Sequence, residues 1–428
     1  MGAAAEKLDQ IDLLLARHPV PAGSGWAHSA RQAALGRLRA LGLPGRRDEY
    51  WKYTDPATFN QYQAPEAAVF ETGESPVFGE IDRLKVVFVD GVFDADASDD
   101  LELAGIEIER LSTVCTHDIH WAKDLYGVLE ARGQVPVARP LAAFNSAVAS
   151  DGVVIRATGR AAKPVSLIYL HKSKASDVVL HHVIRIEDGA DLTILENGPA
   201  AARLNKVLEV DIADRGAFRH VRTQGRDHER RALTHIFARL GSESLFKSFT
   251  LTVNGVLTRN EAVIELTGDD ATAHVAGAAV GDGDFHHDDT VFITHNAVNC
   301  ESRQVYKKVL RNGAKGVFQG KILVKAGAQK TDGYQISQAL LLDDDAQFLA
   351  KPELEIYADD VICSHGSTTG AIDEDALFYL RSRGVPMVQA QDLLVLAFLA
   401  QAIEEIDNAE VAEDLTARLQ AWLQRHSS

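Results

Sequence analysis

The spacing of hydrophobic and polar positions changes twice along the chain. Up to about residue 70, apolar residues recur at helical spacing, and residues 71–150 have a mixed pattern. Between about residues 151 and 362, short runs of apolar and β-branched residues replace this spacing, and helical spacing returns from Asp373 onward. The pattern predicts a helical and mixed region over residues 1–150, a strand-rich core over 151–370 and a helical region over 371–428.

The N-terminal region is expected to combine helices with a short strand. Ser29 and Gln32 have the spacing of a helix capping box, and leucines follow at helical spacing until Gly42. Residues 85–92 are typical of a strand, and residues 114–130 fit a further helix.

The middle region is predicted to consist of strands. Its short apolar runs are punctuated by Gly beside Asp or Asn, as in Asp188-Gly189 and Asn254-Gly255. We expect strands over residues 153–157, 165–170, 178–186, 192–195, 207–212, 245–253, 262–266 and 291–294. About 210 residues without helix-length patterns exclude βαβ units. A sandwich, a barrel, a propeller or a β-solenoid remains possible, and the missing WD or kelch period counts against the propeller.

The C-terminal region is expected to form three helices. Asp373 is placed to cap the first, and the second and third are predicted over residues 389–406 and 409–424. The second helix is apolar on more than one face, which predicts burial within the chain or against a partner.

Composition excludes several classes of function. The 428 residues include 44 Lys and Arg against 61 Asp and Glu, a net charge of −17, which argues against nucleic acid or an anionic membrane as partner. The 3 cysteines, Cys115, Cys300 and Cys363, are too few for a disulfide framework, a zinc ribbon or a four-cysteine cluster site within this chain. The first twenty residues lack a long apolar segment, so we expect a cytoplasmic protein without a secretion signal or membrane span.

Two segments of the chain are weak candidates for ligand sites. Residues 315–322 approach a phosphate-binding loop, but Lys315 replaces its first Gly and Ile322 its hydroxyl residue, so we do not expect ATP binding there. His286, His287 and Asp289 form a possible metal cluster, because alternate residues on a strand share a face. No three-ligand spacing supports it, and solvated or core histidines are the favoured interpretation.

The most specific segment surrounds Cys363 and His365. The two residues are two positions apart, so on an extended strand both side chains point the same way. A thiolate and an imidazole on one face can form a two-ligand half-site for a soft or borderline metal. The alternative is a buried Cys that packs as a small hydrophobic residue beside a hydrogen-bonded His. The half-site requires another subunit to supply the remaining ligands.

This segment resembles the SufB/SufD family of iron–sulfur cluster assembly proteins. The sequence His-Gly-Ser-Thr-Thr-Gly that follows Ser364 is similar to the SufD branch in particular. Ser367, where the family usually has Ala, and the acidic residues 343–345 depart mildly from the pattern. The resemblance rests on residues 49–54 (EYWKYT), 316–322 (GVFQGKI), 329–332 (QKTD) with Gln335, 340–342 (LLL), 352–356 (PELEI), 359–361 (DDV), 363–366 (CSHG) and 377–384 (LFYLRSRG).

The resemblance implies a fold and a role that the spacing leaves open. It implies a right-handed parallel β-helix flanked by N- and C-terminal helical regions. It further implies a non-enzymatic scaffold that pairs with SufB through the β-helix, and that carries the ATPase SufC on its C-terminal helices. His365 is then the candidate ligand or iron-entry residue at the SufB–SufD interface and Cys363 its neighbour, with iron or a nascent cluster shared with SufB. No cofactor is expected to stay tightly bound to the isolated chain, which can also form a homodimer.

An alternative function belongs to another class. Surface acids on a strand-rich core are also typical of a carbohydrate-active β-helix enzyme, a lyase or a glycosidase. The missing secretion signal and the C-terminal pattern disfavour this alternative.

Overall fold

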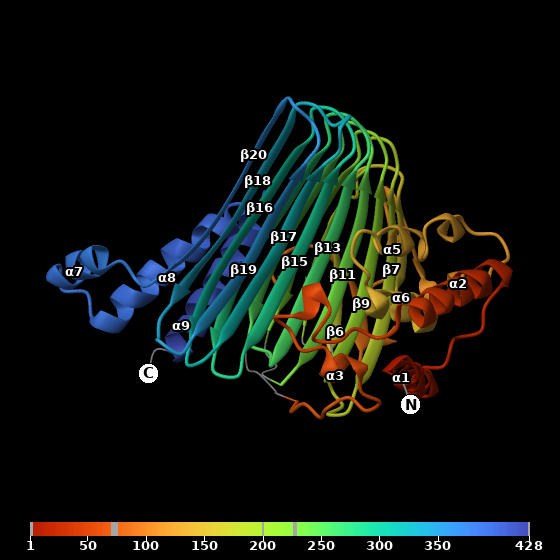
Figure 1. Cartoon of the computed structure of the whole chain (residues 1–428), viewed down its shortest axis with the longest axis horizontal. Helices are drawn as coiled ribbons and strands as arrows, with labels where there is room; N and C mark the ends of the chain where they lie inside the picture. Colours follow the sequence, from red (N-terminus) through yellow and green to blue (C-terminus); the bar gives the residue numbers. More distant parts are fainter. Residues whose placement is uncertain (1–2, 70–75, 199–200, 226–228, 427–428) are drawn as a thin grey trace.

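The computed structural model describes residues 3–69, 76–198, 201–225 and 229–426. Two sheets face each other and form a parallel β-solenoid of about seven turns (Figure 1), which confirms the predicted mainly β fold with helices at both ends. Sheet A has the order β2 (Val92–Phe93), β1 (Leu84–Val89), β6 (Val165–Leu170), β8 (Asp191–Asn197), β10 (Ala217–Gln224), β12 (Leu245–Val253), β14 (Thr272–Asp282), β16 (Glu301–Arg311), β18 (Thr331–Leu341) and β20 (Val361–Gly370). Sheet B has the order β19 (Gln347–Ile356), β17 (Lys315–Val324), β15 (His286–His295), β13 (Leu257–Leu266), β11 (Arg231–Leu240), β9 (Arg203–Ile212), β7 (Asp177–Ile186), β5 (Val153–Ala157), β4 (Ile106–Arg110) and β3 (Glu102–Leu103).

Successive coils stack residue on residue. From β5 onward each strand pairs in parallel with the strand one coil later, so an inward-facing side chain lies over another about 28 positions further along. Leu192, Phe218, Phe246 and Ala273 form one such row, and all four are fully buried. The alternation of inward and outward residues therefore builds a continuous core along the axis of the solenoid.

The turns between sheet B and sheet A also stack. In five successive coils one residue adopts the left-handed conformation, and its backbone N–H donates to a carbonyl in the turn of the next coil. These bonds, 2.5 to 3.0 Å long, satisfy backbone groups that the turn leaves outside the sheets. The residues are Arg215, Glu243, Asp270, Asn299 and Lys330.

Helices cover the two outer faces of the solenoid separately (Figure 1). The N-terminal helices lie on sheet B, where α5 and α6 pack against β7, β9 and β11. The C-terminal helices lie on sheet A, where α8 packs against β14 and β16. The N-terminal set is α1 (Ala3–Arg17), α2 (Gly25–Leu41), η1 (Glu49–Trp51), α3 (Ala57–Asn60), α4 (Leu111–Val114), η2 (Trp121–Asp124), α5 (Val128–Arg132) and α6 (Pro140–Val148), and the C-terminal set is α7 (Glu374–Ser382), α8 (Met387–Ile403) and α9 (Ala409–His426).

The structure corrects two details of the N-terminal prediction. The helix expected over residues 114–130 is divided among α4, η2 and α5, because His120 caps η2 and Gly127 takes a left-handed φ of 70°. The proposed capping box is wrong, since α2 begins at Gly25 and the Ser29 hydroxyl donates to the Gly25 carbonyl inside the helix. The predicted cap of α7 is confirmed, because the Asp373 carboxylate accepts from the N–H groups of Asp375 and Ala376.

Candidate functional site

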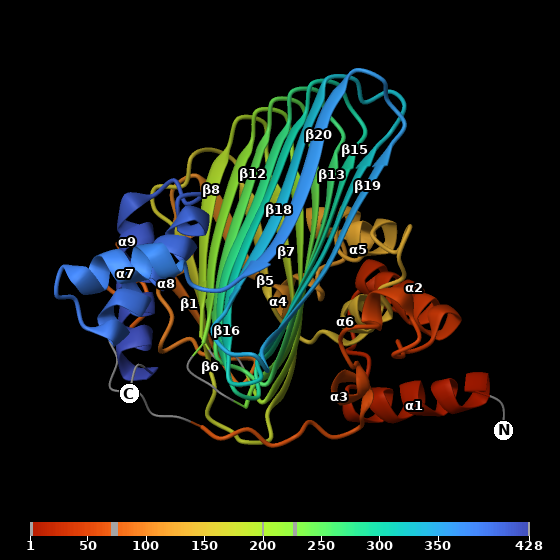
Figure 2. The same cartoon turned by 60° about the vertical axis from the view of Figure 1, so that its left-hand side comes forward.

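The two ends of the solenoid differ in how they finish. At the N-terminal end the outermost strands, β2 and β3, have two residues each and pair antiparallel with their neighbours. At the C-terminal end the outermost strands, β19 and β20, have ten residues each and pair on one side only (Figure 2). A long edge strand presents unpaired N–H and C=O groups that another chain can bind. We call the β19–β20 end the open end.

Cys363 lies on β20 at the open end and points into the solenoid. It stands beside Gly333 of β18 in the parallel register, where a Cβ would lie 3.2 Å from its Sγ. The thiol also packs against the small apolar cluster of Ile322 and Val324. Burial raises the pKa of the Cys363 thiol, so it stays protonated at neutral pH unless a metal displaces the proton.

His365 belongs to the same inward-facing row of β20, two positions further along. It stands beside Gln335 of β18, which is fully buried. His365 itself is exposed, because in the part of the chain that the structure describes no strand pairs with the outer edge of β20. The structure thus has Cys363 and His365 on one strand and facing the same side. Within the described ranges no group of three or more His, Cys, Asp and Glu side chains is arranged to hold a metal ion.

The other candidate metal site, His286 with His287 and Asp289, does not form a ligand cluster. His287 and Asp289 of β15 point into the solenoid, but the Lys308 ammonium group donates to both, at 3.0 Å from Nδ1 and 2.7 Å from the carboxylate. His286 points to the other side, where its ring lies 3.0 Å from the Thr54 hydroxyl. A lysine cation lies between the two inward groups, so the described residues agree with the favoured interpretation of core histidines and not with a metal cluster.

The segment that approached a phosphate loop is also structural. It is strand β17, in which Gln319 faces the N-terminal region and donates to the Tyr50 carbonyl at 3.2 Å. Tyr50 in turn donates to the Glu353 carboxylate of β19 at 2.5 Å, and Lys351 of β19 binds Glu49 at 2.6 Å. The N-terminal element of residues 49–54 thus fastens the last strand of sheet B.

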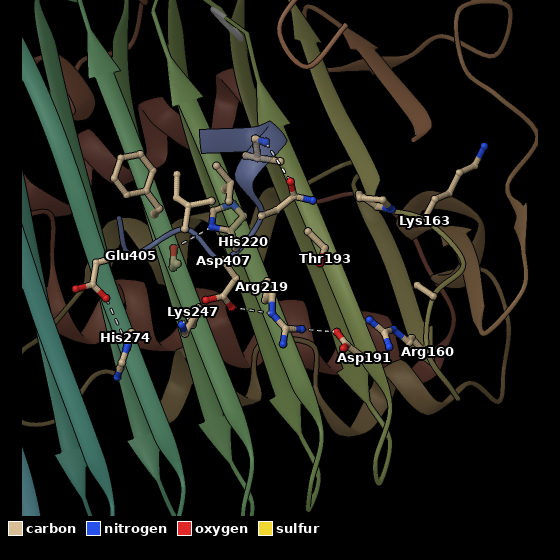
Figure 3. A pocket seen from close by; sticks show the side chains of 18 of the residues that line it. Arg160, Lys163, Asp191, Thr193, Arg219, His220, Lys247, His274, Glu405 and Asp407 are labelled. Carbon is tan, nitrogen blue, oxygen red and sulfur yellow. Dashed lines mark hydrogen bonds and ion pairs between the residues drawn. The ribbon is translucent and has the colours of Figure 1, made fainter. Parts of the chain in front are cut away.

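A cavity lies on sheet A, away from the open end. Its volume is about 620 Å³, and the turn between α8 and α9 closes one side of it (Figure 3). Four basic residues stand at one register position on successive strands of its floor and rim, namely Arg219, Lys247, His274 and Arg303. We call them the basic column.

The acidic turn of the C-terminal helices binds this column. Asp407 accepts from Arg219 at 3.1 Å and from Lys247 at 2.6 Å (Figure 3). Glu405 accepts from Arg303 at 2.7 Å. Burial raises the pKa of Asp407, but Lys247 and Arg219 outweigh it and hold that pKa below its usual range. The cavity is thus the junction that fixes α8 and α9 to the solenoid. Sequence reasoning missed it, although basic residues recurring about every 28 positions were a usable signal.

An exposed apolar surface lies on the outer side of the C-terminal helices. The helices α8 and α9 bury one face against sheet A, including Leu399 and Leu415. The opposite side and α7 leave large side chains in solvent, with Phe378 74% exposed. The other members are Tyr379, Met387, Val388 and Leu393. We call these five residues the outer apolar surface.

Comparison with known proteins assigns this architecture to a family. Residues 169–398 match the model described as SUF system FeS cluster assembly, SufBD core domain. The chain belongs to the SufBD family. The matched range runs from β6 through the open end into α8, so it includes both Cys363 and His365.

Relatives of this SufBD-family chain agree with the predicted branch. The protein named iron–sulfur cluster assembly protein SufD of Escherichia coli is 27% identical over 91% of this chain and 91% of its own length. The protein of the same name from Bacillus subtilis is 28% identical over 59% of this chain and 60% of its own length. A SufBD family protein of Synechocystis is 26% identical over 89% of this chain and 88% of its own length. The prediction of the SufB/SufD family and its SufD branch is confirmed.

Two further expectations meet these findings. The matched proteins are named for cluster assembly and not as lyases or glycosidases, which favours the first of the two predicted functions. Among the helices that the structure describes, none has both the length and the apolar character needed to span a bilayer.

Proposed function

We propose that this SufBD-family chain is a non-enzymatic, cytoplasmic scaffold subunit for iron–sulfur cluster assembly. It pairs with a SufB subunit through the open end, carries the ATPase SufC on its C-terminal helices, and presents His365 to iron at the junction with SufB. The observation that carries the proposal is an unprotected edge strand with an exposed imidazole in the row of its inward-facing residues.

The composition of β20 supports pairing with another subunit. Edge strands of proteins that work alone are usually blunted by charges, by Pro or by a cover. Strand β19 has Lys351, Pro352 and Glu353, but β20 has no Lys, Arg, Asp, Glu or Pro between Val361 and Gly370. A related subunit that extends both sheets would satisfy the free backbone groups and bury the exposed Ile362.

The chemistry of the two side chains favours His365 as the iron ligand. A neutral imidazole binds Fe²⁺ through a ring nitrogen, and an exposed ring can turn towards ligands of a second subunit. Cys363 binds only as a thiolate, which burial disfavours until a metal is close. Iron or a nascent cluster would therefore be held jointly by ligands of the two subunits. Because the isolated chain has only its own part of this site, we expect no tightly bound cofactor on it.

Replacement of His365 tests this role directly. In a complex reconstituted with SufB and SufC, we expect His365→Ala to lower cluster yield at least about tenfold, because one of few ligands at the junction is lost. Iron and acid-labile sulfide per complex are the measurement. Ser364→Ala is the matched control, since Ser364 lies on the same strand and faces the other side. Equal yields for the wild type and His365→Ala, with an intact complex, would refute the role of His365.

The outer apolar surface supports the docking of SufC. Ion pairs between the basic column and the acidic turn fix α8 and α9 against sheet A, so the helices that carry the outer apolar surface have a defined position on the solenoid. A groove on a partner that takes an apolar helix face would remove these side chains from water.

A charge in this surface should abolish that docking. We expect Phe378→Asp and Leu393→Asp to weaken SufC binding by more than tenfold each, since both side chains are exposed and their replacement leaves the fold intact. Binding is measured by calorimetry with purified SufC. Val92→Asp, an equally drastic change at an exposed position of the other end, is the control. Undiminished affinity in both helix variants would contradict this docking site.

A further inference from the structure

One buried residue next to His365 has no hydrogen-bond partner among the described residues. Gln335 is fully buried, and neither its Nε2 nor its Oε1 has a hydrogen-bond partner in the structure. Leaving both atoms of a buried amide unpaired is unfavourable, because each group has lost its bond to water without replacing it. A buried amide in this state would be stabilised by a hydrogen-bond partner that becomes fixed only when another subunit binds.

The register puts that partner next to it. Gln335 and His365 stand opposite each other in the parallel pair of β18 and β20, and both belong to inward-facing rows. Neighbouring strands are about 4.8 Å apart, so a five-atom side chain and an imidazole reach each other easily. Among the described strands, none lies beyond β20 on the side away from β18.

The same rows already contain side-chain bonds of this type. Four coils earlier, the ring of His220 lies 3.0 Å from the hydroxyl of Ser248 on the adjacent strand. Two positions along from the Gln335–His365 pair, the Ser337 hydroxyl on β18 donates to the Ser367 hydroxyl on β20 at 3.1 Å. A cross-strand bond from His365 to Gln335 would repeat an arrangement that the solenoid uses elsewhere.

A glycine of the opposite sheet makes room for the amide. A Cβ at Gly320 of β17 would overlap Oε1 of Gln335, so the long side chain can cross the interior only because this position lacks one. Gly320 belongs to the GVFQGKI segment, and this contact explains why a glycine stands there in the strand. The amide is thus held in place by packing and not by hydrogen bonds.

We propose that Gln335 is a positioning residue for His365. In the complex with SufB, where His365 is covered, the amide turns from Gly320 and its oxygen accepts the N–H of one ring nitrogen, which fixes the tautomer and turns the other nitrogen towards the iron at the open end. Imidazole ligands usually require such a partner on the second nitrogen, and its removal typically costs about 10- to 100-fold in metal affinity. The inference rests on the proposed function of His365 and adds the residue that orients it.

Gln304 provides a matched control within the same row. It stands one strand further from the open end, opposite Gln335 on β16, and is equally buried with both amide atoms unpartnered. Replacing either glutamine by Leu removes a buried amide of the same kind in the same environment. Only Gln335 stands directly beside His365, whereas Gln304 is separated from it by one strand.

The test is iron binding by the whole complex with SufB and SufC. With Fe²⁺ alone as the ligand under anaerobic conditions, we expect Gln335→Leu to weaken binding about tenfold and Gln304→Leu less than about twofold. Gln335→Glu should restore most of the affinity, because it returns an acceptor oxygen at the same distance. Gly320→Ala, which displaces the amide without removing it, should weaken binding in the same direction as Gln335→Leu.

A spectroscopic signature separates orientation from a general loss of packing. The ¹⁵N shifts of the His365 ring, assigned by their loss in His365→Ala, should show one tautomer in the wild-type complex and a mixture in Gln335→Leu. Equal affinities and equal ring shifts for the two leucine variants would overturn the inference while leaving the proposed function intact. Unchanged iron binding in His365→Ala would instead overturn the proposed function of His365 and this inference with it.

Discussion

Single histidines inside the solenoid are built to remain neutral. His295 is fully buried, and its Nε2 lies 2.8 Å from the hydroxyl of Ser302. Burial alone lowers the pKa of His295 to about 4, because the protonated ring would lose its hydration without gaining a carboxylate. Such a residue packs well at neutral pH and opposes folding in acid.

The sign of this effect follows from the unfolded state. An unfolded His has a pKa near 6.5, so between about pH 6.5 and 4 the unfolded chain binds a proton that the folded chain does not. The contribution of neutral His295 is therefore complete above about pH 6.5 and is lost as the pH falls, by about 2 kcal/mol at pH 5.

We expect His295→Gln to reduce the acid sensitivity of the fold. Gln can keep a bond to Ser302 but takes up no proton, so the free energy of unfolding should fall by about 2 kcal/mol less than in the wild type between pH 7 and pH 5. Urea titrations at both pH values give this difference. His28→Gln, at an exposed position, should keep the wild-type pH dependence. A slope equal to that of the wild type in His295→Gln would show that His295 is not the neutral group described.

At the scale of elements, apolar runs located strands but not the solenoid. Every predicted run of the middle region lies within an observed strand, and 153–157, 165–170 and 245–253 match β5, β6 and β12. Strands such as β16 were missed because they carry charged residues on the inward side, where Lys308 binds Asp289. Buried ion pairs disguise the alternation on which strand prediction depends.

The candidate site was predictable only as far as neighbours in sequence allowed. The two-residue spacing of Cys363 and His365 predicts a shared side, and the strand β20 provides it. Gln335 could not be recognised without the register, because its neighbour His365 lies one coil away. For the basic column the sequence offered one signal, the recurrence of basic residues about every 28 positions, and the acidic turn that binds them lies far away in the sequence. The family resemblance supplied the β-helix that spacing alone left open.

At the scale of the whole molecule, the solenoid has one end whose two long edge strands each pair on one side only. One end stops in two short antiparallel strands, whereas the other exposes two full strands and the inward row that contains His365. The helices on the two faces leave this end uncovered (Figure 2). A second subunit, either SufB or another copy of this chain, would complete the backbone bonding there.

This difference between the ends predicts where charge abolishes pairing. We expect the double variant Ser364→Lys and Thr368→Lys to weaken association with SufB by more than tenfold, because both residues lie on the exposed outward row of β20 and charges on an edge strand oppose strand addition. Val92→Lys on β2, exposed on the edge strand of the other end, should leave association unchanged. Sedimentation velocity of the mixed and the isolated chains measures both the heterodimer and any homodimer. If the β20 variant associates as tightly as the wild type while Val92→Lys does not, pairing takes place through the opposite end, and the roles assigned to the open end would have to be given up together.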